Sequence, residues 1–255
     1  MILLELKGLT KYFGGLAAVD SLDLAVNAGQ IVGLIGPNGA GKTTAFSLIA
    51  GFLPPTRGSV LFKGEDITNL KPNKIAGKGL TRTFQLTTLF GEMTVAENLY
   101  IAVHLQARPS FFGSIFSAPS TRSKEQELHD RTGALMDSMG LSELRDELAK
   151  NLPHGHQRLL GIAMAIATDP EVVLLDEPVS GMNQEETTTT MRLINEIRET
   201  GVTVLLVEHN MRTVMELCDR IAVLNYGNKI AEGTPKEISE DEDVIKAYLG
   251  SEEAA

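Results

Sequence analysis

The 255-residue sequence has a single cysteine, fewer basic than acidic residues and no long apolar segment. Cys218 has no second cysteine with which to form a disulfide in the chain, which is typical of a protein of a reducing compartment. Lys and Arg number 23 against 33 Asp and Glu, a formal net charge of −10. Surfaces that bind nucleic acid or anionic lipid usually carry the opposite sign, so we expect no nucleic-acid partner.

The apolar stretches are too short to cross a membrane. The longest uncharged stretch with helical spacing, residues 159–168, has about half of the ~20 residues that a spanning helix needs. Glu5 and Lys7 interrupt the apolar N-terminus too early for a signal peptide. If the protein works at a membrane, we expect it to do so as a peripheral subunit.

Short apolar runs alternate with helical patterns, which predicts an α/β fold. Residues 31–35, 172–175 and 202–207 are continuous runs rich in β-branched side chains, as in strands of a parallel sheet that is covered on both faces. The helical patterns between and after these runs cover residues 42–51, 184–199 and 210–217.

Two parts of the chain depart from this alternation. Residues 3–8 and 22–27 alternate polar and apolar side chains, which predicts antiparallel strands with one solvent-facing side. Residues 86–155 instead show helical spacing, interrupted by an irregular loop at 108–121, and they predict a helical insertion. A terminal helix is expected near the C-terminus, within residues 236–250.

A phosphate-binding motif follows the first apolar run. Residues 36–43 match G-x-x-x-x-G-K-[ST] between a predicted strand and a predicted helix. The glycines allow backbone N–H groups to surround a phosphate, while Lys42 supplies a charge and Thr43 a hydroxyl for Mg²⁺. The glycines alone would also suit a helix-capping turn, but Lys42 and Thr43 favour nucleotide binding. The expected nucleotide contacts in this loop are Gly36, Pro37, Asn38, Gly39, Ala40, Gly41, Lys42, Thr43 and Thr44.

Ionisable side chains follow two further predicted strands. Asp176 comes directly after residues 172–175, where a carboxylate can hold Mg²⁺ through water. Glu177 can then orient or deprotonate a water for in-line attack on a phosphate, although both acids would also suit a solvated strand end. His209 follows residues 202–207, so we expect its imidazole at the same carboxyl edge of the sheet, where ligands bind in open α/β folds.

The order of these features along the chain is informative as a whole. It runs through Phe13, residues 36–44, Gln85, the G-H-Q-R region at 155–158, V-V-L-L-D-E-P at 172–178, and Glu208-His209. This succession resembles the nucleotide-binding subunit of ATP-binding cassette (ABC) transporters. More narrowly, residues 13–19, 82–98, 181–183 and 224–235 are similar to the ATPase subunits of branched-chain (hydrophobic) amino acid importers.

The resemblance implies a fold and a division into domains. It implies a P-loop NTPase core with an N-terminal antiparallel β subdomain and an inserted α-helical subdomain, the ABC ATPase fold. Residues 1–85 and 156–255 would form the RecA-like nucleotide-binding core with the antiparallel β subdomain. Residues 86–155 would form the helical signature subdomain, and residues 236–250 a C-terminal helix within the core.

The resemblance also implies roles for single residues. Phe13 matches the aromatic residue that stacks on adenine. The alternatives are that Phe13 packs in the core or that Tyr12 takes its place. Val19 is also expected beside the nucleotide. Gln85 matches the hinge glutamine that meets Mg²⁺ or the attacking water. The remaining matches are Asp176 as the metal-side aspartate, Glu177 as the general base and His209 as the switch histidine, so that Thr43, Gln85 and Asp176 would hold Mg²⁺, partly through water.

The family signature, normally Leu-Ser-Gly-Gly-Gln, is altered in this sequence. The matching stretch at 152–157 reads Leu-Pro-His-Gly-His-Gln, and Pro153 removes the hydroxyl and the backbone N–H of the serine position. Gly155 and Gln157 remain as expected contacts to the nucleotide of a partner subunit. His154 and His156 are either partial replacements for the lost donors or plain surface histidines. Two unlike ATP sites would suit a pair of different ATPase subunits.

We therefore expect an ATP-binding and ATP-hydrolysing subunit of an ABC importer for branched-chain or other amino acids or related small solutes. Its cofactors would be ATP and Mg²⁺. Its partners would be a second, different or identical, ABC ATPase subunit, two integral membrane permease subunits and, indirectly, a periplasmic or extracellular solute-binding protein. It would lie peripherally on the cytoplasmic face of the inner or plasma membrane. The alternatives are a soluble ABC ATPase without a transport role and a regulatory pairing subunit with one degenerate ATP site.

Overall fold

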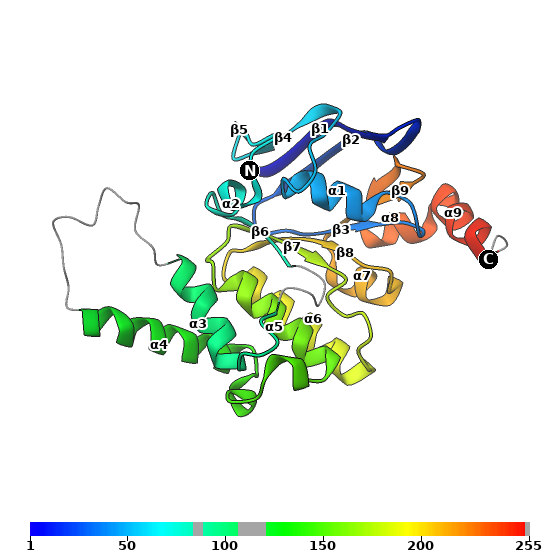
Figure 1. Ribbon diagram of the computed structural model, residues 1–255. Coiled ribbons are helices and arrows are strands. Elements are labelled where there is room, and N and C mark those ends of the chain that lie inside the picture. Colours follow the sequence, from blue (N-terminus) through cyan, green and yellow to red (C-terminus); the bar gives the residue numbers. More distant parts are fainter. Residues whose placement is uncertain (84–88, 107–120, 253–255) are drawn as a thin grey trace.

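The computed structural model describes residues 1–83, 89–106 and 121–252 (Figure 1). Two sheets and the helices around them make up this part of the chain. Gln85 and nearly all of the loop expected at 108–121 lie outside the described residues, so what the sequence predicts for them stays a prediction.

An antiparallel sheet is formed by the N-terminal part of the chain. Its central strand β1 pairs with β2 on one side and β4 on the other. Leu4 and Leu6 of β1 are buried, whereas Glu5 and Lys7 form an ion pair at the surface. The expected antiparallel strands with one solvent-facing side are therefore confirmed. In the order β2-β1-β4-β5, the strands are β2 (Leu16–Asn27), β1 (Ile2–Phe13), β4 (Arg57–Phe62) and β5 (Glu65–Asp66).

A six-stranded sheet forms the centre of the molecule. All neighbouring strands in it are parallel except β9 and β10, which form a hairpin. Every residue of β3, β7 and β8 is buried, as their continuous apolar runs predicted. In the order β10-β9-β3-β8-β7-β6, the strands are β10 (Asn228–Gly233), β9 (Arg220–Asn225), β3 (Ile31–Ile35), β8 (Thr203–Val207), β7 (Val172–Asp176) and β6 (Leu80–Arg82).

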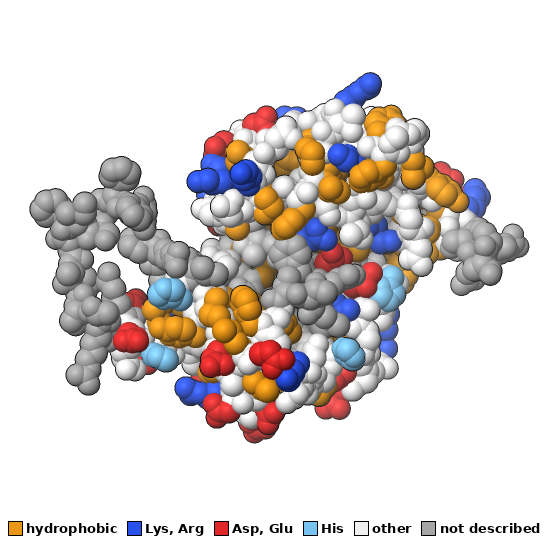
Figure 2. Space-filling model, viewed as in Figure 1, with side chains coloured by type: hydrophobic (Ala, Val, Ile, Leu, Met, Phe, Trp, Pro, Cys, Tyr) orange, Lys and Arg blue, Asp and Glu red, His pale blue; other side chains and the backbone are white. Residues whose placement is uncertain are grey.

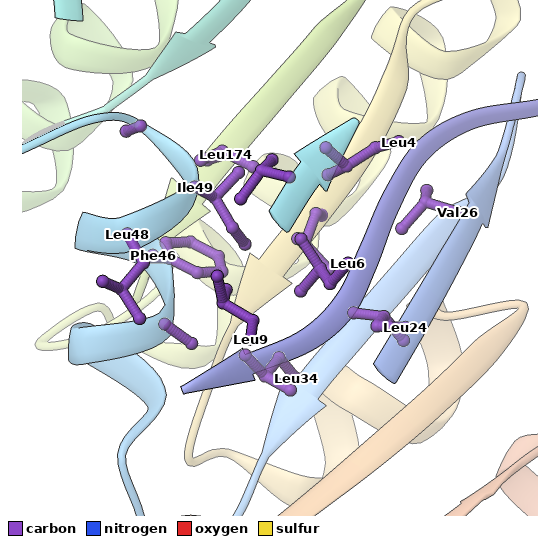
Figure 3. Packing of buried hydrophobic residues seen from close by; sticks show 14 of the residues in the cluster. Leu4, Leu6, Leu9, Leu24, Val26, Leu34, Phe46, Leu48, Ile49 and Leu174 are labelled. Carbon is purple, nitrogen blue, oxygen red and sulfur yellow. The ribbon is translucent and has the colours of Figure 1, made fainter. Parts of the chain in front are cut away.

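The two faces of this sheet support separate cores. Because side chains alternate along a strand, Val32 and Leu34 of β3 point to one face and Ile31 and Ile35 to the other. The first face packs against α1 (Lys42–Ile49) and the antiparallel sheet, as Figure 3 shows for Phe46 of α1 beside the leucines of β1. The other face is covered by α5 (His154–Ile166), α6 (Gln184–Glu199) and α7 (Met211–Leu217).

Helices dominate the segment between β6 and β7. Helices α3 (Val95–Gln106) and α4 (Thr121–Ser138) lie against each other, and α3 also contacts α5 (Figure 1). The fully buried Asn98 holds the chain entering α3, since its amide group donates to the carbonyls of Phe90 at 3.1 Å and Thr94 at 2.9 Å. Shorter helical elements are α2 (Pro72–Ala76), before β6, and the 3₁₀ turns η2 (Ser142–Leu144) and η3 (Ala149–Asn151), after α4.

The C-terminal stretch differs from the expected single helix over 236–250. It contains two helices, α8 (Pro235–Glu240) and α9 (Glu242–Glu252). Asp241 separates them with an extended backbone, and its carboxylate accepts hydrogen bonds from the N–H groups of Asp243 at 2.9 Å and Val244 at 3.0 Å. The acidic side chain read as part of one helix therefore caps the start of a second.

In the ranges that the structure describes, none of the helices combines the length and the apolar character that crossing a membrane requires.

Candidate nucleotide-binding site

The predicted site residues meet at the carboxyl edge of the six-stranded sheet. Strands β3, β8 and β7 are adjacent and parallel, so the residues that follow them emerge at the same edge. Figure 2 shows basic, acidic and histidine side chains close together on the face above β8 and α7.

The loop after β3 has a backbone that tolerates only glycine at two positions. Gly36 and Gly41 have φ angles of 149° and 103°. A Cβ at Gly36 would lie 2.1 Å from the carbonyl oxygen of Leu224, and one at Gly41 would lie 2.2 Å from that of Ala18. Gly41 is also the N-cap of α1 and offers no side-chain acceptor to the first turn. The N–H groups of that turn are thus available to an anionic ligand.

Lys42 closes this loop from the inside. Its ammonium donates to the carbonyl oxygens of Gly36 at 2.6 Å and Pro37 at 2.9 Å. Burial lowers the pKa of Lys42, while the carboxylates of Glu177 and Asp176 act in the opposite direction. A partly buried cation in a concave loop is suited to bind phosphate oxygens.

An open cavity of about 300 Å³ lies over the loop. Glu177 reaches it from the end of β7, and Tyr226 reaches it from the β9–β10 turn. The turn is held to the loop because the N–H of Gly227 donates to the carbonyl of Ala40 at 3.0 Å. The other lining residues are Leu16, Ala17, Ala18, Asn38, Gly39, Ala40, Gly41, Lys42, Thr43 and Thr44.

Two predicted adenine-side residues are not among those that line the cavity. Phe13 lies at the end of β1 with about half of its surface exposed, and the ammonium of Lys11 lies 5.4 Å from its ring centroid. Val19 is fully buried in the core instead, where its side chain lies under Gly41. Val19 therefore supports the loop from below, while Phe13 is free at the surface to stack on a planar ligand.

Asp176 is buried at the end of β7 and paired with Arg82. The guanidinium of Arg82 lies 2.6 Å from the Asp176 carboxylate, and the two side chains are 8% and 4% exposed. Arg82 also donates to the hydroxyl of Ser47 at 3.0 Å and lies over the ring of Phe46. This ion pair joins β6, β7 and α1, and nothing in the sequence pattern indicated it.

Glu177 and His209 face each other across the edge. The Nδ1 atom of His209 lies 3.9 Å from a carboxylate oxygen of Glu177, and both side chains are partly exposed. Glu177 has a φ of 49°, in the left-handed region, and its N–H donates to the carbonyl of Val207 at 2.9 Å. Its own carbonyl accepts a 2.8 Å hydrogen bond from Arg158 of α5. Hydrogen bonds from β8 and α5 therefore hold the backbone of Glu177, the predicted base.

The oxygen donors at this site suit a Mg²⁺ ion that is bound together with a nucleotide, rather than a metal ion that is held by protein side chains alone. Within the described ranges, no group of three or more His, Cys, Asp or Glu side chains is placed to bind a metal ion. The hydroxyl of Thr43 and the carboxylate of Asp176 are hard oxygen donors, and Mg²⁺ in nucleotide sites takes few protein ligands because phosphates and waters complete its shell. The residues present therefore fit Mg²⁺ bound together with a nucleotide.

Comparisons with known proteins identify the family. The family model described as ABC transporter matches residues 19–180, more than half of the chain. The chain belongs to the ABC transporter family. A second model, described as branched-chain amino acid ATP-binding cassette transporter, matches residues 228–254. The prediction of an ATP-binding and ATP-hydrolysing ABC subunit is thereby confirmed.

Individual relatives cover nearly the whole ABC ATPase. Two are 45% identical over 249 residues, with 97% of this chain and 98% of the relative covered: BraF of Pseudomonas aeruginosa and LivG of Escherichia coli. Both are named high-affinity branched-chain amino acid transport ATP-binding proteins. Among solved structures, the ADP conformation of an ATP-binding cassette has a TM-score of 0.85 at 31% identity and covers 98% of this chain and 99% of that one. These similarities confirm the predicted fold and a nucleotide as the ligand.

The altered signature begins α5 of this ABC ATPase. Pro153 is the N-cap and makes no side-chain capping bond, and the Gln157 amide donates to the carbonyl of Leu152 at 2.9 Å. Gly155 is buried, with the carboxyl group of Glu186 about 3.1 Å from where a Cβ would lie. Neither Gly155 nor Gln157 lines the cavity over the phosphate-binding loop of its own chain.

Several residues of the site had no signal in the ABC ATPase sequence. Arg82 and Arg158 act through partners far along the chain, at separations of 94 and 19 residues. Tyr226 lies in the turn between β9 and β10 and is 83% exposed. Its position beside the phosphate-binding loop depends on how β9 pairs with β3.

Proposed function

We propose that the protein is the ATPase subunit of an importer of branched-chain amino acids or related small solutes. The 45% identity to BraF and LivG over nearly the full length, together with the match of residues 228–254, supports this solute class. The solute itself would be recognised by other subunits, since the ATPase site is shaped for a nucleotide.

Each part of the site has a task in this proposal. The loop of residues 36–44 wraps the phosphates, and Lys42 neutralises charge on the β- and γ-phosphates. Thr43, Asp176 and Gln85 would hold Mg²⁺, partly through water, and the ion would supply charge stabilisation of the phosphate oxygens. Phe13 stacks on the adenine, with Val19 supporting the loop below it.

Hydrolysis is assigned to the Glu177–His209 pair. Glu177 takes a proton from the water that attacks the γ-phosphate, and His209 orients the γ-phosphate and the carboxylate. The observation that carries this assignment is the 3.9 Å separation of the two side chains beside the cavity that Lys42 also lines. Asp176, the remaining acidic residue at this sheet edge, is buried and paired with Arg82.

Replacing Glu177 tests this assignment. The amide of Glu177→Gln keeps the size of the side chain but does not accept a proton, so hydrolysis should fall by about 10²-fold or more while ATP still binds. The matched control is Glu185→Gln, which removes an exposed acidic charge in the first turn of α6 and should hydrolyse normally. A Glu177→Gln protein with close to the normal turnover would remove the basis of the assignment.

The partners follow from the altered signature. Pro153 lacks the hydroxyl and the N–H that this helix start would give to a nucleotide of the partner subunit. We therefore propose pairing with a second, different ABC ATPase subunit whose own signature completes the site on this chain. Two integral membrane permease subunits would receive the motion through the helical segment of residues 86–155. A periplasmic or extracellular solute-binding protein would take part indirectly, with the ATPase pair peripheral on the cytoplasmic face of the membrane.

A regulatory role is the second candidate. If the site completed by Pro153, Gly155 and Gln157 does not hydrolyse ATP, this half of the pair would bind nucleotide to hold the two subunits together. The P-loop of this chain would still carry out hydrolysis, because Lys42, Thr43 and Glu177 are present around its cavity.

A further inference from the structure

Glu208 is a fully buried acidic residue next to the proposed catalytic pair. It follows β8, directly before His209, and its side chain has 0% exposure. Neither the phosphate-binding loop nor the cavity over it includes this residue. A carboxylate is expensive to bury unless hydrogen bonds replace its water, so its partners indicate what it does.

The two oxygens of Glu208 hold two different loops. Oε1 accepts a hydrogen bond from the backbone N–H of Val179 at 2.9 Å. Oε2 accepts from the N–H of His209 at 3.1 Å and from that of Asn210 at 3.4 Å. One side chain therefore joins the turn after β7, which carries Glu177, to the loop after β8, which carries His209.

The turn after β7 needs such support. Glu177 has a left-handed φ of 49°, which is costly for a residue with a Cβ and persists where surrounding contacts hold it. Its N–H and carbonyl are held by Val207 and Arg158, and Val179, two residues later, is held by Glu208. Of these three contacts, the one from Glu208 is the one that also reaches the histidine loop.

We propose that Glu208 is a positioning residue that sets the distance between the Glu177 carboxylate and the His209 imidazole. The inference rests on the proposed roles of that pair in ATP hydrolysis. Both loops meet on the Glu208 carboxylate, and its Oε2 lies 3.9 Å from Nδ1 of His209, the same distance that separates this nitrogen from the Glu177 carboxylate. Small displacements of reacting groups reduce rates strongly, which makes this separation sensitive to the side chain behind it.

The isosteric variant Glu208→Gln separates positioning from burial. An amide of the same shape offers a single acceptor oxygen, and its NH₂ group then faces backbone N–H donors of one of the two loops. We expect kcat to fall by about tenfold or more, while KM and the dissociation constant for ATP change by less than about twofold. The matched control is Glu216→Gln, an exposed carboxylate in α7 paired with Arg212, for which we expect no change in kcat.

A double variant tests whether Glu208 acts through His209. His209→Ala removes the imidazole whose position Glu208 is proposed to fix, so Glu208→Gln should cost less in that background than in the unmodified protein. All rates are measured on the full-length chain in its assembled transporter, with thermal unfolding recorded in parallel. If Glu208→Gln does not accumulate as folded protein, Glu208→Asp keeps the charge but shortens the reach, and the same division between kcat and KM is expected.

The outcomes distinguish this inference from the proposed function. Three results would each overturn the positioning role. The first is a normal kcat in Glu208→Gln, and the second is a rise in its ATP dissociation constant as large as its loss in rate. The third is a double variant whose loss in kcat equals the product of the losses in Glu208→Gln and His209→Ala. If Glu177→Gln and His209→Ala hydrolyse ATP slowly while Glu208→Gln hydrolyses it at the normal rate, the positioning role of Glu208 is overturned and the catalytic pair is retained. Normal hydrolysis in Glu177→Gln and His209→Ala would overturn the proposed catalytic pair and, with it, the role of Glu208.

Discussion

The ion pair of Arg82 and Asp176 allows a test of whether burial, rather than contact distance, decides how much an ion pair contributes to stability. Their atoms lie 2.6 Å apart with both side chains less than 10% exposed. Arg212 and Glu216 form a similar contact at 2.8 Å, but with 67% and 50% exposure. Replacing either arginine by alanine removes one guanidinium–carboxylate contact and leaves a carboxylate that is buried in one variant and exposed in the other.

The expected costs differ several-fold. Removing one partner of a buried pair leaves a charge without compensation and typically costs about 3–5 kcal/mol in free energy of unfolding. Arg82→Ala also loses the hydrogen bond to Ser47 and the contact with the Phe46 ring, which places it at the upper part of that range. The exposed pair on α7 contributes much less, because water and salt screen its charges. For a protein of this size, about 3 kcal/mol corresponds to a decrease in Tm of roughly 6–12 °C.

Thermal and denaturant unfolding without nucleotide measure the difference. We expect Arg82→Ala to lower Tm by several degrees and Arg212→Ala by about one degree or less. The double variant Arg82→Ala/Asp176→Ala should lose less stability than the sum of the single variants, because it leaves no uncompensated charge. Equal decreases in Arg82→Ala and Arg212→Ala would refute the argument that burial makes this pair costly to break.

Two further predictions concern the nucleotide. Gly41→Ala should weaken ATP binding by at least about tenfold, since its Cβ would lie 2.2 Å from the Ala18 carbonyl oxygen. The control is Gly133→Ala in α4, where a Cβ would have no atom within 4 Å; this variant should bind ATP normally and be slightly more stable. Equal ATP binding by the two variants would contradict the steric argument. Pro153→Ser should raise transporter ATPase activity by about twofold if the site completed by this signature is inactive. An unchanged rate in the assembled complex would argue against a defective signature.

Much of the fold could be predicted from patterns within single segments. The runs of β3, β7 and β8 predict buried parallel strands because they are almost entirely apolar, as in strands that are covered on both faces. The helical pattern over residues 184–199 likewise agrees with the bounds of α6, and the structure adds the capping box of Asn183 and Glu186 at its start. The single helix expected over 236–250 is two helices in the structure, because the Asp241 carboxylate accepts hydrogen bonds from the N–H groups of Asp243 and Val244 and so caps the start of α9.

The site could be predicted where its parts are contiguous. Residues 36–44 are contiguous and cover the turn after β3 and the first residues of α1, so their spacing alone predicts a phosphate-binding motif. Val19 was predicted beside the nucleotide but is a core residue under that loop, because strand alternation near the start of β2 turns its side chain inward. Gln85 lies outside the described residues, and its role stays a prediction.

The sequence by itself determined the chemistry of this protein: a phosphate loop, two acids and a histidine, each at the end of an apolar strand. Only the tertiary structure decided how they are held. Arg82 reaches Asp176 across 94 positions, and Glu208 bonds Val179 across 29. The pairing of β6, β7 and β8 brings these residues together, and sequence periodicity carries no record of which strands are neighbours. Local patterns therefore specify which groups are present, while strand order specifies their partners and distances.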